Sequence, residues 1–480
     1  MNYKAIRYIL FRVLELLGVL YLLPTLVSLF YKERSAILFL LGALFFFAIG
    51  YAGTRNRPTP LVFYAREGFV VTALAWIVIS ACGAIPFVLS GAIPNYLDAL
   101  FETVSGFTTT GASILSDVEH MEKGVMFWRC FTHWVGGMGF LVFMLAVLPL
   151  SDGYSMHLMR AESPGPSVGK FVPRVRQTAE ILYAIYLGIT VIEIVLLMIS
   201  GLSLYEASTL TFSTVGTGGF SITNAGINPY PVASQAIITF FMALCGINFS
   251  VFYFFIIKRP DEAVKSDETR WYLITMLVSA ILIAINVYAA GMGTTPGMTF
   301  HHSLFTVASV MTTTGFATWD FNLWPEFSRT LLFCLMLIGA CAGSTGGGFK
   351  FSRLVILVRN IRNELGFVVH PKSIKRVYMD GAVVERTTVK SVTAYLSIYV
   401  CVYVVSLILL SLDKFDFTTN MTAVAATLNN IGPGLNVVGA TGNYGGFSGL
   451  SKVVLIFDML AGRLELMPML ILLRRTTWRK

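Results

Sequence analysis

Four short polar segments that contain glycine interrupt an otherwise apolar chain: TTTGAS at residues 108–113, TVGTGGFS at 214–221, TTTGFAT at 312–318 and NNIGPGLN at 429–436. When one glycine is aligned from each segment, the repeats lie roughly 100 residues apart, which indicates one structural unit used four times. The aligned glycines are Gly111, Gly218, Gly315 and Gly432. The sequence between these segments is therefore expected to repeat as well.

The composition places the chain in a membrane. Of 480 residues, 55% are hydrophobic and only 13% are charged, which leaves too little polar surface for a soluble globule. Apolar runs at 181–199, 271–289, 392–410 and 453–473 have the length of about 20 residues needed to cross roughly 30 Å of hydrocarbon. Two more spans are expected at 6–30 and 35–53, and the first is too long for a cleaved signal peptide.

Each repeat has the same internal order: a long apolar span, a turn, a half-length apolar segment that ends at the glycine motif, a polar connection and a second long span. The half-length segments are too short to cross a bilayer and must return to the side they entered. They lie at 97–108, 204–213, 299–311 and 418–428. The sequence therefore predicts an all-α integral membrane protein with four pseudo-repeated helix–pore loop–helix units around a central pore and two additional N-terminal transmembrane helices. About ten full spans and four re-entrant helices are expected.

These patterns also predict the domain boundaries. The parts are residues 1–66 (the N-terminal two-helix addition), 67–150 (pore unit 1), 151–178 (a cytoplasmic linker), 179–258 (pore unit 2), 271–390 (pore unit 3, with a broken second span and a cytoplasmic segment) and 391–480 (pore unit 4).

The basic residues predict the topology. The net charge is +9, and most lysines and arginines fall on every second connection between spans, with the longest basic stretch at 350–390. Under the positive-inside rule these connections and both termini lie in the cytoplasm, as in a multi-pass protein of a bacterial inner membrane. Because the charges are scattered between spans, no nucleic-acid surface is expected.

No cofactor or catalytic site is expected. The six cysteines lack C-x-x-C spacing, and the six histidines lack the spacing of metal ligands, so neither a metal cluster nor haem is predicted. Carboxylates within the apolar stretches, such as Glu102 and Glu193, are scattered. We therefore expect a protein that is not an enzyme.

The four glycine segments have the chemistry of a filter for monovalent cations. A cation that leaves water needs oxygens with strong dipoles but no full charge, and backbone carbonyls supply them. Glycine allows carbonyls to point inward, threonine hydroxyls add oxygens, and each half-length helix directs its negative C-terminal end at the ion. The carbonyl and helix dipoles alone do not predict whether the filter selects potassium over sodium. The predicted filter residues are Thr109, Thr110, Gly111, Gly216, Thr217, Gly218, Thr313, Thr314, Gly315, Asn430, Ile431 and Gly432.

Together with these segments, four further motifs give the chain its resemblance to the bacterial Trk-type potassium uptake proteins of the Trk/Ktr/HKT superfamily. They are HWVGGMG at 133–139, MRAESPGP at 159–166, AGSTGGGFK at 342–350 and GRLE at 462–465. In that superfamily a glycine in each filter segment accompanies potassium selectivity, so the resemblance implies potassium as the transported ion, bound at the filter residues. Thr217 departs from the family pattern, which has an aliphatic residue ahead of the glycine.

A second cluster of glycines predicts a break in the second span of unit 3. Gly343, Gly346, Gly347 and Gly348 precede Lys350, and glycine costs about 1 kcal/mol relative to alanine in a helix. The segment does not fit the phosphate-binding pattern G-x-x-x-x-G-K-[ST]. The resemblance implies that this segment is an intramembrane loop that blocks the path below the filter and moves during gating.

Arg463 is expected inside the membrane. On a continuous helix it would lie about 16 Å from Arg474, at 1.5 Å per residue, where a charge requires a partner or water. Two interpretations remain open from the sequence. One is a structural ion pair with Asp458 or Glu465; the other, which the resemblance supports, is a positive gate that faces the pore.

The resemblance also implies partners. Trk-type membrane subunits pair as homodimers and bind a cytoplasmic, nucleotide-binding regulatory subunit that is TrkA-like, while the basic connections are suited to membrane lipid. No cofactor is expected to bind this chain itself. Two alternatives to a gated potassium channel remain: a symporter that couples potassium to protons or sodium, and a sodium-permeable relative.

Overall fold

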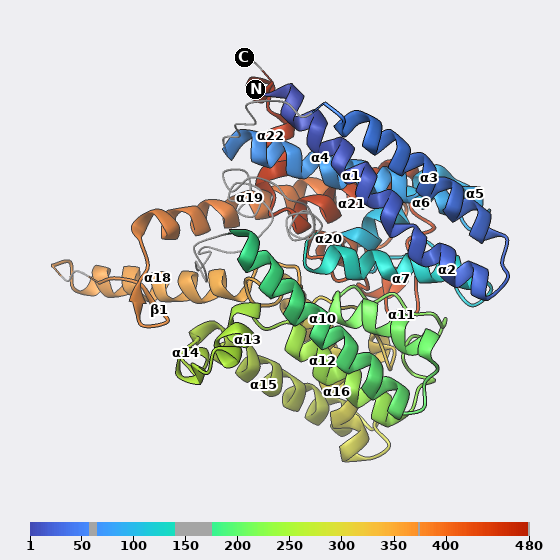
Figure 1. Ribbon diagram of the computed structural model, residues 1–480. Coiled ribbons are helices and arrows are strands. Elements are labelled where there is room, and N and C mark those ends of the chain that lie inside the picture. Colours follow the sequence, from blue (N-terminus) through green and yellow to red (C-terminus); the bar gives the residue numbers. More distant parts are fainter. Residues whose placement is uncertain (57–64, 140–174, 373–374, 479–480) are drawn as a thin grey trace.

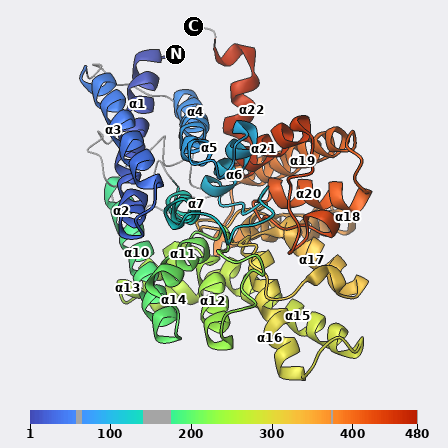
Figure 2. The ribbon, with the colours of Figure 1, turned by 90° about the vertical axis from the view of Figure 1, so that its right-hand side faces the viewer.

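The computed structural model describes residues 1–56, 65–139, 175–372 and 375–478. Helices dominate, and a short antiparallel hairpin of β1 (Tyr378–Met379) and β2 (Ala382–Val383) forms the sheet within these ranges. Viewed as in Figure 2, the chain passes in sequence order around a common centre, from blue through green and yellow to red. The predicted fold class, an all-α membrane protein, is confirmed.

The N-terminal addition consists of closely packed helices against unit 1. Glycines allow this approach: a Cβ on Gly18 would lie 2.7 Å from the carbonyl oxygen of Ala43, and one on Gly50 would lie 2.4 Å from the amide nitrogen of Glu15. The helices are α1 (Tyr3–Leu20), α2 (Leu22–Phe30) and α3 (Ser35–Thr54). α1 also packs on α4, and α2 on α7.

Units 1 and 2 each start with a long span followed by a short re-entrant helix. Unit 1 contains α4 (Ala65–Gly83), α5 (Ile85–Leu89), α6 (Tyr96–Phe107) and α7 (Lys123–Gly137). Unit 2 contains α10 (Val175–Ile199), α11 (Leu204–Val215), α12 (Val232–Cys245), α13 (Phe249–Ile256) and α14 (Pro260–Val264). Three parts of the chain lie outside the described residues: the end of unit 1 after residue 139, most of the linker expected at 151–178 and the motif at 159–166.

Units 3 and 4 repeat this order. Unit 3 contains α15 (Asp267–Ala289), α16 (Pro296–Met311), η1 (Phe321–Leu323), α17 (Glu326–Ile338) and α18 (Phe351–Val369). Unit 4 contains α19 (Arg386–Leu410), α20 (Phe417–Leu428), η2 (Asn436–Val438), α21 (Gly449–Arg463), α22 (Met467–Leu473) and η3 (Arg475–Thr477). In Figure 1, α18, the β-hairpin and the start of α19 form an arm that projects from the rest of the molecule.

The re-entrant helices α6, α11, α16 and α20 are short and begin at clear capping signals. Their lengths are 12, 12, 16 and 12 residues, or about 18–24 Å at 1.5 Å per residue, which is less than the hydrocarbon thickness. In each, the side chain of the N-cap residue accepts a hydrogen bond from a backbone N–H of the first turn. The caps are Asn95, Ser203, Thr295 and Asp416.

The packing of the units is cyclic. Each second span contacts the re-entrant helix of the following unit: α7 packs on α11, α12 on α16, α17 on α20, and α21 returns to α6 of unit 1. This circular order brings the C-terminal ends of the four re-entrant helices together at the centre.

The second spans of units 2 and 4, which the sequence predicts as full spans, are interrupted in the structure. Within the described residues, six helical segments are long and apolar enough to cross a membrane, or seven if the bent pair α12 and α13 is one span. That pair is bent by 91°, and the run at 453–473 is split between α21 and α22, with Glu465 and Leu466 at positive φ. Breaks of this kind are tolerated where protein satisfies the freed backbone groups. At the α12–α13 break, the Gly246 carbonyl accepts from Cys341 N at 3.0 Å and Phe249 N donates to the Gly343 carbonyl at 3.0 Å.

The close helix contact at Gly18 gives a stability prediction. Gly18→Ala should lower the free energy of unfolding by about 1–3 kcal/mol, because the added methyl group overpacks the interface between α1 and α3. Gly188→Ala on α10 is the matched control, since a Cβ there meets nothing within 4 Å. Melting curves of detergent-solubilised protein, monitored by size-exclusion chromatography, measure both; equal stability of the two variants would contradict the proposed packing.

Candidate functional site: a ring of glycine segments

The four glycine segments have the same backbone conformation. At the second position after each re-entrant helix, a non-glycine residue has a positive φ: Thr109 at 54°, Thr217 at 53°, Thr313 at 60° and Asn430 at 55°. Two residues later a glycine has a positive φ: Gly111 at 76°, Gly219 at 78°, Gly315 at 84° and Gly432 at 92°. Non-glycine residues rarely adopt this region, and four equivalent instances show that the surrounding structure imposes it.

This register corrects the alignment of the second segment: the equivalent glycine is Gly219, not Gly218. The hydrogen bonds agree, because the residue ahead of each glycine donates to the carbonyl five positions back. These bonds run from Thr110 to Ser105, Gly218 to Ser213, Thr314 to Ser309 and Ile431 to Ala426, at 2.8–2.9 Å. Thr217 therefore occupies the same place as Thr109 and Thr313, and Gly218 occupies the place of Thr110, Thr314 and Ile431. The sequence alone does not distinguish Gly218 from Gly219, because the two glycines are adjacent. The structure does, because the position of each ring residue is counted from the end of its re-entrant helix, and α11 ends at Val215.

The segments form a closed ring with no room for side chains on the glycines. A Cβ on Gly111 would lie 1.9 Å from the Gly218 carbonyl oxygen, one on Gly219 would lie 1.9 Å from that of Thr314, and one on Gly315 would lie 2.1 Å from that of Ile431. A Cβ on Gly432 would lie 2.6 Å from the Thr110 carbonyl oxygen. Each segment thus abuts the next in sequence order, and the fourth abuts the first. The glycines predicted as neighbours are brought together around one axis.

Two oxygens remain without hydrogen bonds at the inner end of the ring, by which we mean the end next to the re-entrant helices. Among the described residues, Thr109 Oγ1 and Asn430 Oδ1 are buried and have no hydrogen-bond partner. The amide Nδ2 of Asn430 donates to Thr110 Oγ1 and to the Met459 carbonyl, both at 2.9 Å, which orients the side chain. Buried acceptors without donors are costly, and a dehydrated cation is a species that satisfies them.

A buried ion pair packs beside the ring and connects two of its segments. Arg129 Nε lies 2.7 Å from Glu102 Oε1, and both side chains are almost fully buried. Glu102 also accepts from Ser113 Oγ at 2.9 Å, and Arg129 Nη1 donates to the Ser221 carbonyl at 3.1 Å. The pair therefore links the segments of units 1 and 2 while its charges neutralise each other near the pore. The sequence marks Glu102 only as one of several scattered carboxylates and does not point to Arg129. The two residues are 27 positions apart, with the end of α6, a loop and the start of α7 between them, so no local pattern indicates that they pair.

His133 of the HWVGGMG motif also supports the ring. Its Nδ1 lies 2.7 Å from the Gly106 carbonyl oxygen, and its Nε2 accepts from Phe220 N at 3.3 Å. Since Gly106 and Phe220 lie just before the first segment and just after Gly219, the imidazole acts as a spacer between units 1 and 2.

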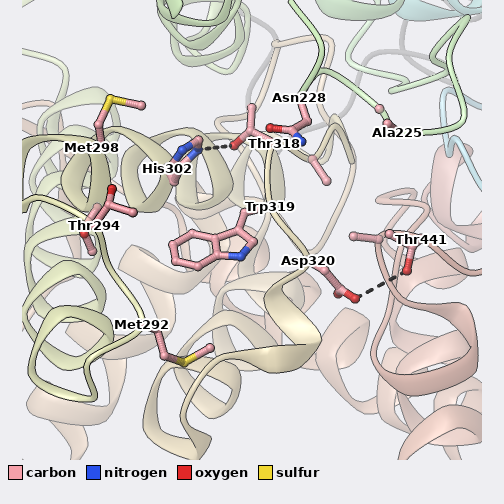
Figure 3. A pocket seen from close by; sticks show the side chains of 14 residues that line it. Ala225, Asn228, Met292, Thr294, Met298, His302, Thr318, Trp319, Asp320 and Thr441 are labelled. Atoms are coloured by element: carbon pink, nitrogen blue, oxygen red, sulfur yellow. Dashed lines mark hydrogen bonds between the residues drawn. The ribbon is translucent and has the colours of Figure 1, made fainter.

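Loops from different units enclose a cavity of about 210 Å³ at the outer end of the ring, and its lining includes all four ring glycines. An adjoining chamber of about 460 Å³ shares Gly226, Ala317, Ala440 and Thr441 with it. Figure 3 shows this chamber, where His302 lies 2.9 Å from Thr318 Oγ1 and Asp320 lies 3.4 Å from Thr441 Oγ1. The described linings of both cavities contain one cation, Arg129, which is paired.

A polar cluster ties the outer loops of units 1 and 2. Asn224 donates to Asp117 Oδ1 at 2.9 Å and accepts from Val118 N at 2.9 Å. Hydrogen bonds from Asn224 and from His120 lower the pKa of Asp117 to about 2. Because the pKa is lowered, the stabilisation is present above the unfolded value of about 3.9 and is lost only as the pH falls toward 2.

The predicted break in unit 3 is confirmed, and the loop lies against the inner end of the ring. α17 ends before Gly339 and α18 begins at Phe351. Gly347 N donates to Thr313 Oγ1 at 2.6 Å. A Cβ on Gly346 would lie 2.8 Å from the Thr312 carbonyl oxygen, and one on Gly347 would lie 2.5 Å from that of Asn429. Lys350 Nζ donates to the Gly346 carbonyl within the loop.

Arg463 contacts carbonyl groups of two units. Its Nη1 donates to the Thr345 carbonyl at 2.7 Å, and its Nη2 donates to the carbonyls of Gly136 and Gly137, each at 2.5 Å. The carboxylates considered as its partners have other contacts: Glu465 pairs with Arg353 at 2.5 Å, and Asp458 accepts from Ser406 at 2.7 Å. The depth calculated from Arg474 does not apply, because the helix ends at Arg463.

The corrected register predicts that Gly219 is essential for cation flux. Gly219→Ala should reduce ⁸⁶Rb⁺ uptake into proteoliposomes by more than about ten-fold, because its methyl group would collide with a ring carbonyl and demand a strained φ. Gly297→Ala on α16 is the matched control, since its Cβ meets nothing within 4 Å. Normal uptake by folded Gly219→Ala protein would refute the register.

Comparisons with known proteins agree with this architecture. Residues 37–478 match the family model described as TrkH, cation transport protein. The chain is 34% identical to the Trk system potassium uptake protein TrkH of Vibrio parahaemolyticus and 33% identical to that of Escherichia coli K12, and in both comparisons the match covers 100% of each chain. The crystal structure of the potassium transporter TrkH from Vibrio parahaemolyticus superposes with a TM-score of 0.89 at 32% identity and full coverage of both chains. The chain belongs to the TrkH family of cation transport proteins.

Proposed function

We propose that the chain is the membrane subunit of a gated, potassium-selective uptake system. The observation that carries the proposal is the closed ring of four segments, in which each glycine abuts a carbonyl of the next segment. The names of the relatives, which describe potassium uptake, support potassium as the transported ion. The chain itself is proposed to act without a cofactor and without catalysing a covalent reaction.

In the filter, backbone carbonyls and threonine hydroxyls replace the water around the ion. The C-terminal ends of α6, α11, α16 and α20 converge there, and each contributes about half a negative charge. The four segments contain no carboxylate, so an ion is attracted by dipoles and can still leave. The free oxygens of Thr109 and Asn430 are candidate ligands at the inner end.

The gate consists of the glycine loop and Arg463 below the filter. Gly346 and Gly347 lie against the inner residues of the ring, and Arg463 links the loop carbonyl of Thr345 to the end of α7. The arrangement supports a closed state in which backbone and a positive charge obstruct the path. Conduction then requires the loop to move away and Arg463 to exchange partners.

We propose that the chain lies in a bacterial inner membrane with both termini in the cytoplasm. The positive-inside rule supports this orientation and a cytoplasmic position for the arm of α18 and the hairpin.

The arm offers surfaces for two partners. Exposed apolar residues on α18 support contact with a second copy of the chain: Val358, Ile361, Leu365 and Val368. Between α18 and α19 lies a cavity of about 960 Å³. Its lining carries an excess of positive charge, which suits an acidic surface of a regulatory subunit: the basic residues are Lys372, Lys375, Arg376, Arg386 and Lys390, and the acidic ones are Glu364 and Glu385.

Growth of a bacterium that lacks potassium uptake tests the function. The chain should restore growth at low potassium, whereas Gly315→Ser and Gly219→Ser should lose this rescue or admit sodium, because either change distorts the ring. Uptake of K⁺ against its gradient, measured with and without proton and sodium gradients, separates a symporter from a channel. Failure of the expressed, folded chain to move K⁺ would refute the proposal.

Replacement of Arg463 tests the gate. Arg463→Ala should raise basal ⁸⁶Rb⁺ flux by roughly ten-fold, because the loop loses the contact that holds Thr345 and the path loses a positive charge. Arg475→Ala is the control, because it removes an exposed arginine of η3. Unchanged flux with lower stability would favour a purely structural role for Arg463.

A further inference from the structure

We propose that Glu268 is a positioning residue that anchors both ends of the intramembrane loop and thereby sets its closed position. The inference rests on the proposed gate and adds the element that determines where the loop lies. Glu268 belongs to the first turn of α15, a different helix from those that flank the loop.

One oxygen of Glu268 holds the two sides of the loop together. Oε1 accepts from Ala342 N at 2.6 Å and from Ser352 N at 2.8 Å. Ala342 lies on the segment that follows α17, and Ser352 is the second residue of α18. The side chain is buried, with 4% of its residue surface exposed, so these charge-assisted bonds form with little competition from water.

The anchor satisfies a helix terminus that lacks a cap of its own. α18 begins after Lys350, which has a φ of 79° and makes no side-chain capping bond. The first N–H groups of a helix need external acceptors, and the Glu268 carboxylate supplies one to Ser352 from another helix. The carboxylate also belongs to the first turn of α15, where the helix dipole favours negative charge. Two helix N-termini thus share one buried anion.

The loop divides into a fixed base and a separate tip. At the base, Lys350 N donates to the Ile338 carbonyl at 3.0 Å and Phe351 N donates to that of Ala340 at 2.9 Å. The contacts with the ring and with Arg463 lie further along, at Gly347 and Thr345. With Glu268 in place, the tip can leave the filter while the base stays attached to α15.

This geometry also connects the arm to the gate. α18 is also held by the ion pairs of Arg359 with Asp267 and of Arg353 with Glu465, so a force on the far end of α18 passes through these pairs to the bond between Ser352 and Glu268. Movement of α18 relative to α15 would therefore stretch the anchor and displace the base of the loop. A partner that binds the arm has a direct mechanical route to the gate.

The test compares Glu268→Ala with Glu268→Gln in the full-length protein in lipid bilayers. Glu268→Ala should raise basal open probability and ⁸⁶Rb⁺ flux by roughly ten-fold, while single-channel conductance and the K⁺/Na⁺ ratio stay unchanged because the filter is intact. Glu268→Gln should remain close to the natural protein, since its carboxamide oxygen can accept both bonds. Glu326→Ala, which removes an exposed first-turn glutamate of α17, is the matched control.

Two further variants make the outcome decisive. Ser352→Pro deletes one donor at a first-turn position that tolerates proline, and it should also raise basal flux if Glu268→Ala fails to fold. The basal flux of the double variant Glu268→Ala/Arg463→Ala should not exceed that of either single variant, because both substitutions release the same loop. If Arg463→Ala raises flux but folded Glu268→Ala and Ser352→Pro do not, the anchor is refuted and the gate stands. If no loop or Arg463 variant changes flux while the chain still conducts, the proposed gate itself fails.

Discussion

The close approach of four backbone segments around one axis is the constraint on which the rest of the structure depends. Distances of 1.9–2.6 Å between a hypothetical Cβ on the ring glycines and carbonyl oxygens of the next segment leave no space for a side chain. Only glycine permits both this proximity and the positive φ. Such irregular backbone can exist at membrane depth only where it is buried in protein or lines a water-filled cavity, and the cyclic packing of second spans on re-entrant helices shields it from lipid.

Two ion pairs connect elements around the ring without adding net charge. Arg129 with Glu102, and Lys452 with Asp98 at 2.6 Å, connect elements distant in sequence. A lone buried charge would carry a large desolvation cost, whereas a paired one fixes geometry. The His133 imidazole also fixes the geometry of the ring, through its hydrogen bonds with the Gly106 carbonyl and with Phe220 N. The ring thus retains the field of helix ends and carbonyl dipoles.

Broken helices concentrate on the inner side of the ring. Backbone groups freed at the breaks of units 2 and 3 bind one another: Cys341 N donates to the Gly246 carbonyl, and Phe249 N donates to the Gly343 carbonyl. The Thr345 carbonyl of unit 3 accepts instead from the guanidinium of Arg463 in unit 4. A continuous helix would satisfy its own backbone and could not form these contacts. The unwound segments therefore place the loop of unit 3 against the ring, and Glu268 bonds both ends of that loop to α15, an unbroken helix.

The sequence by itself determined the membrane class, the four repeats, the re-entrant helices and the glycine loop, because these depend on local hydrophobicity, length and glycine content. It predicted most ring residues for the same reason. Only the tertiary structure decided that Gly219 is the ring glycine, since the count starts where α11 ends, and that the second spans of units 2 and 4 are broken, since their freed carbonyls and N–H groups find partners in other units. The partners of Arg463, Glu102 and Glu268 lie far away along the chain. Pairings of that kind are fixed by how the units close around the axis, and no local pattern records them.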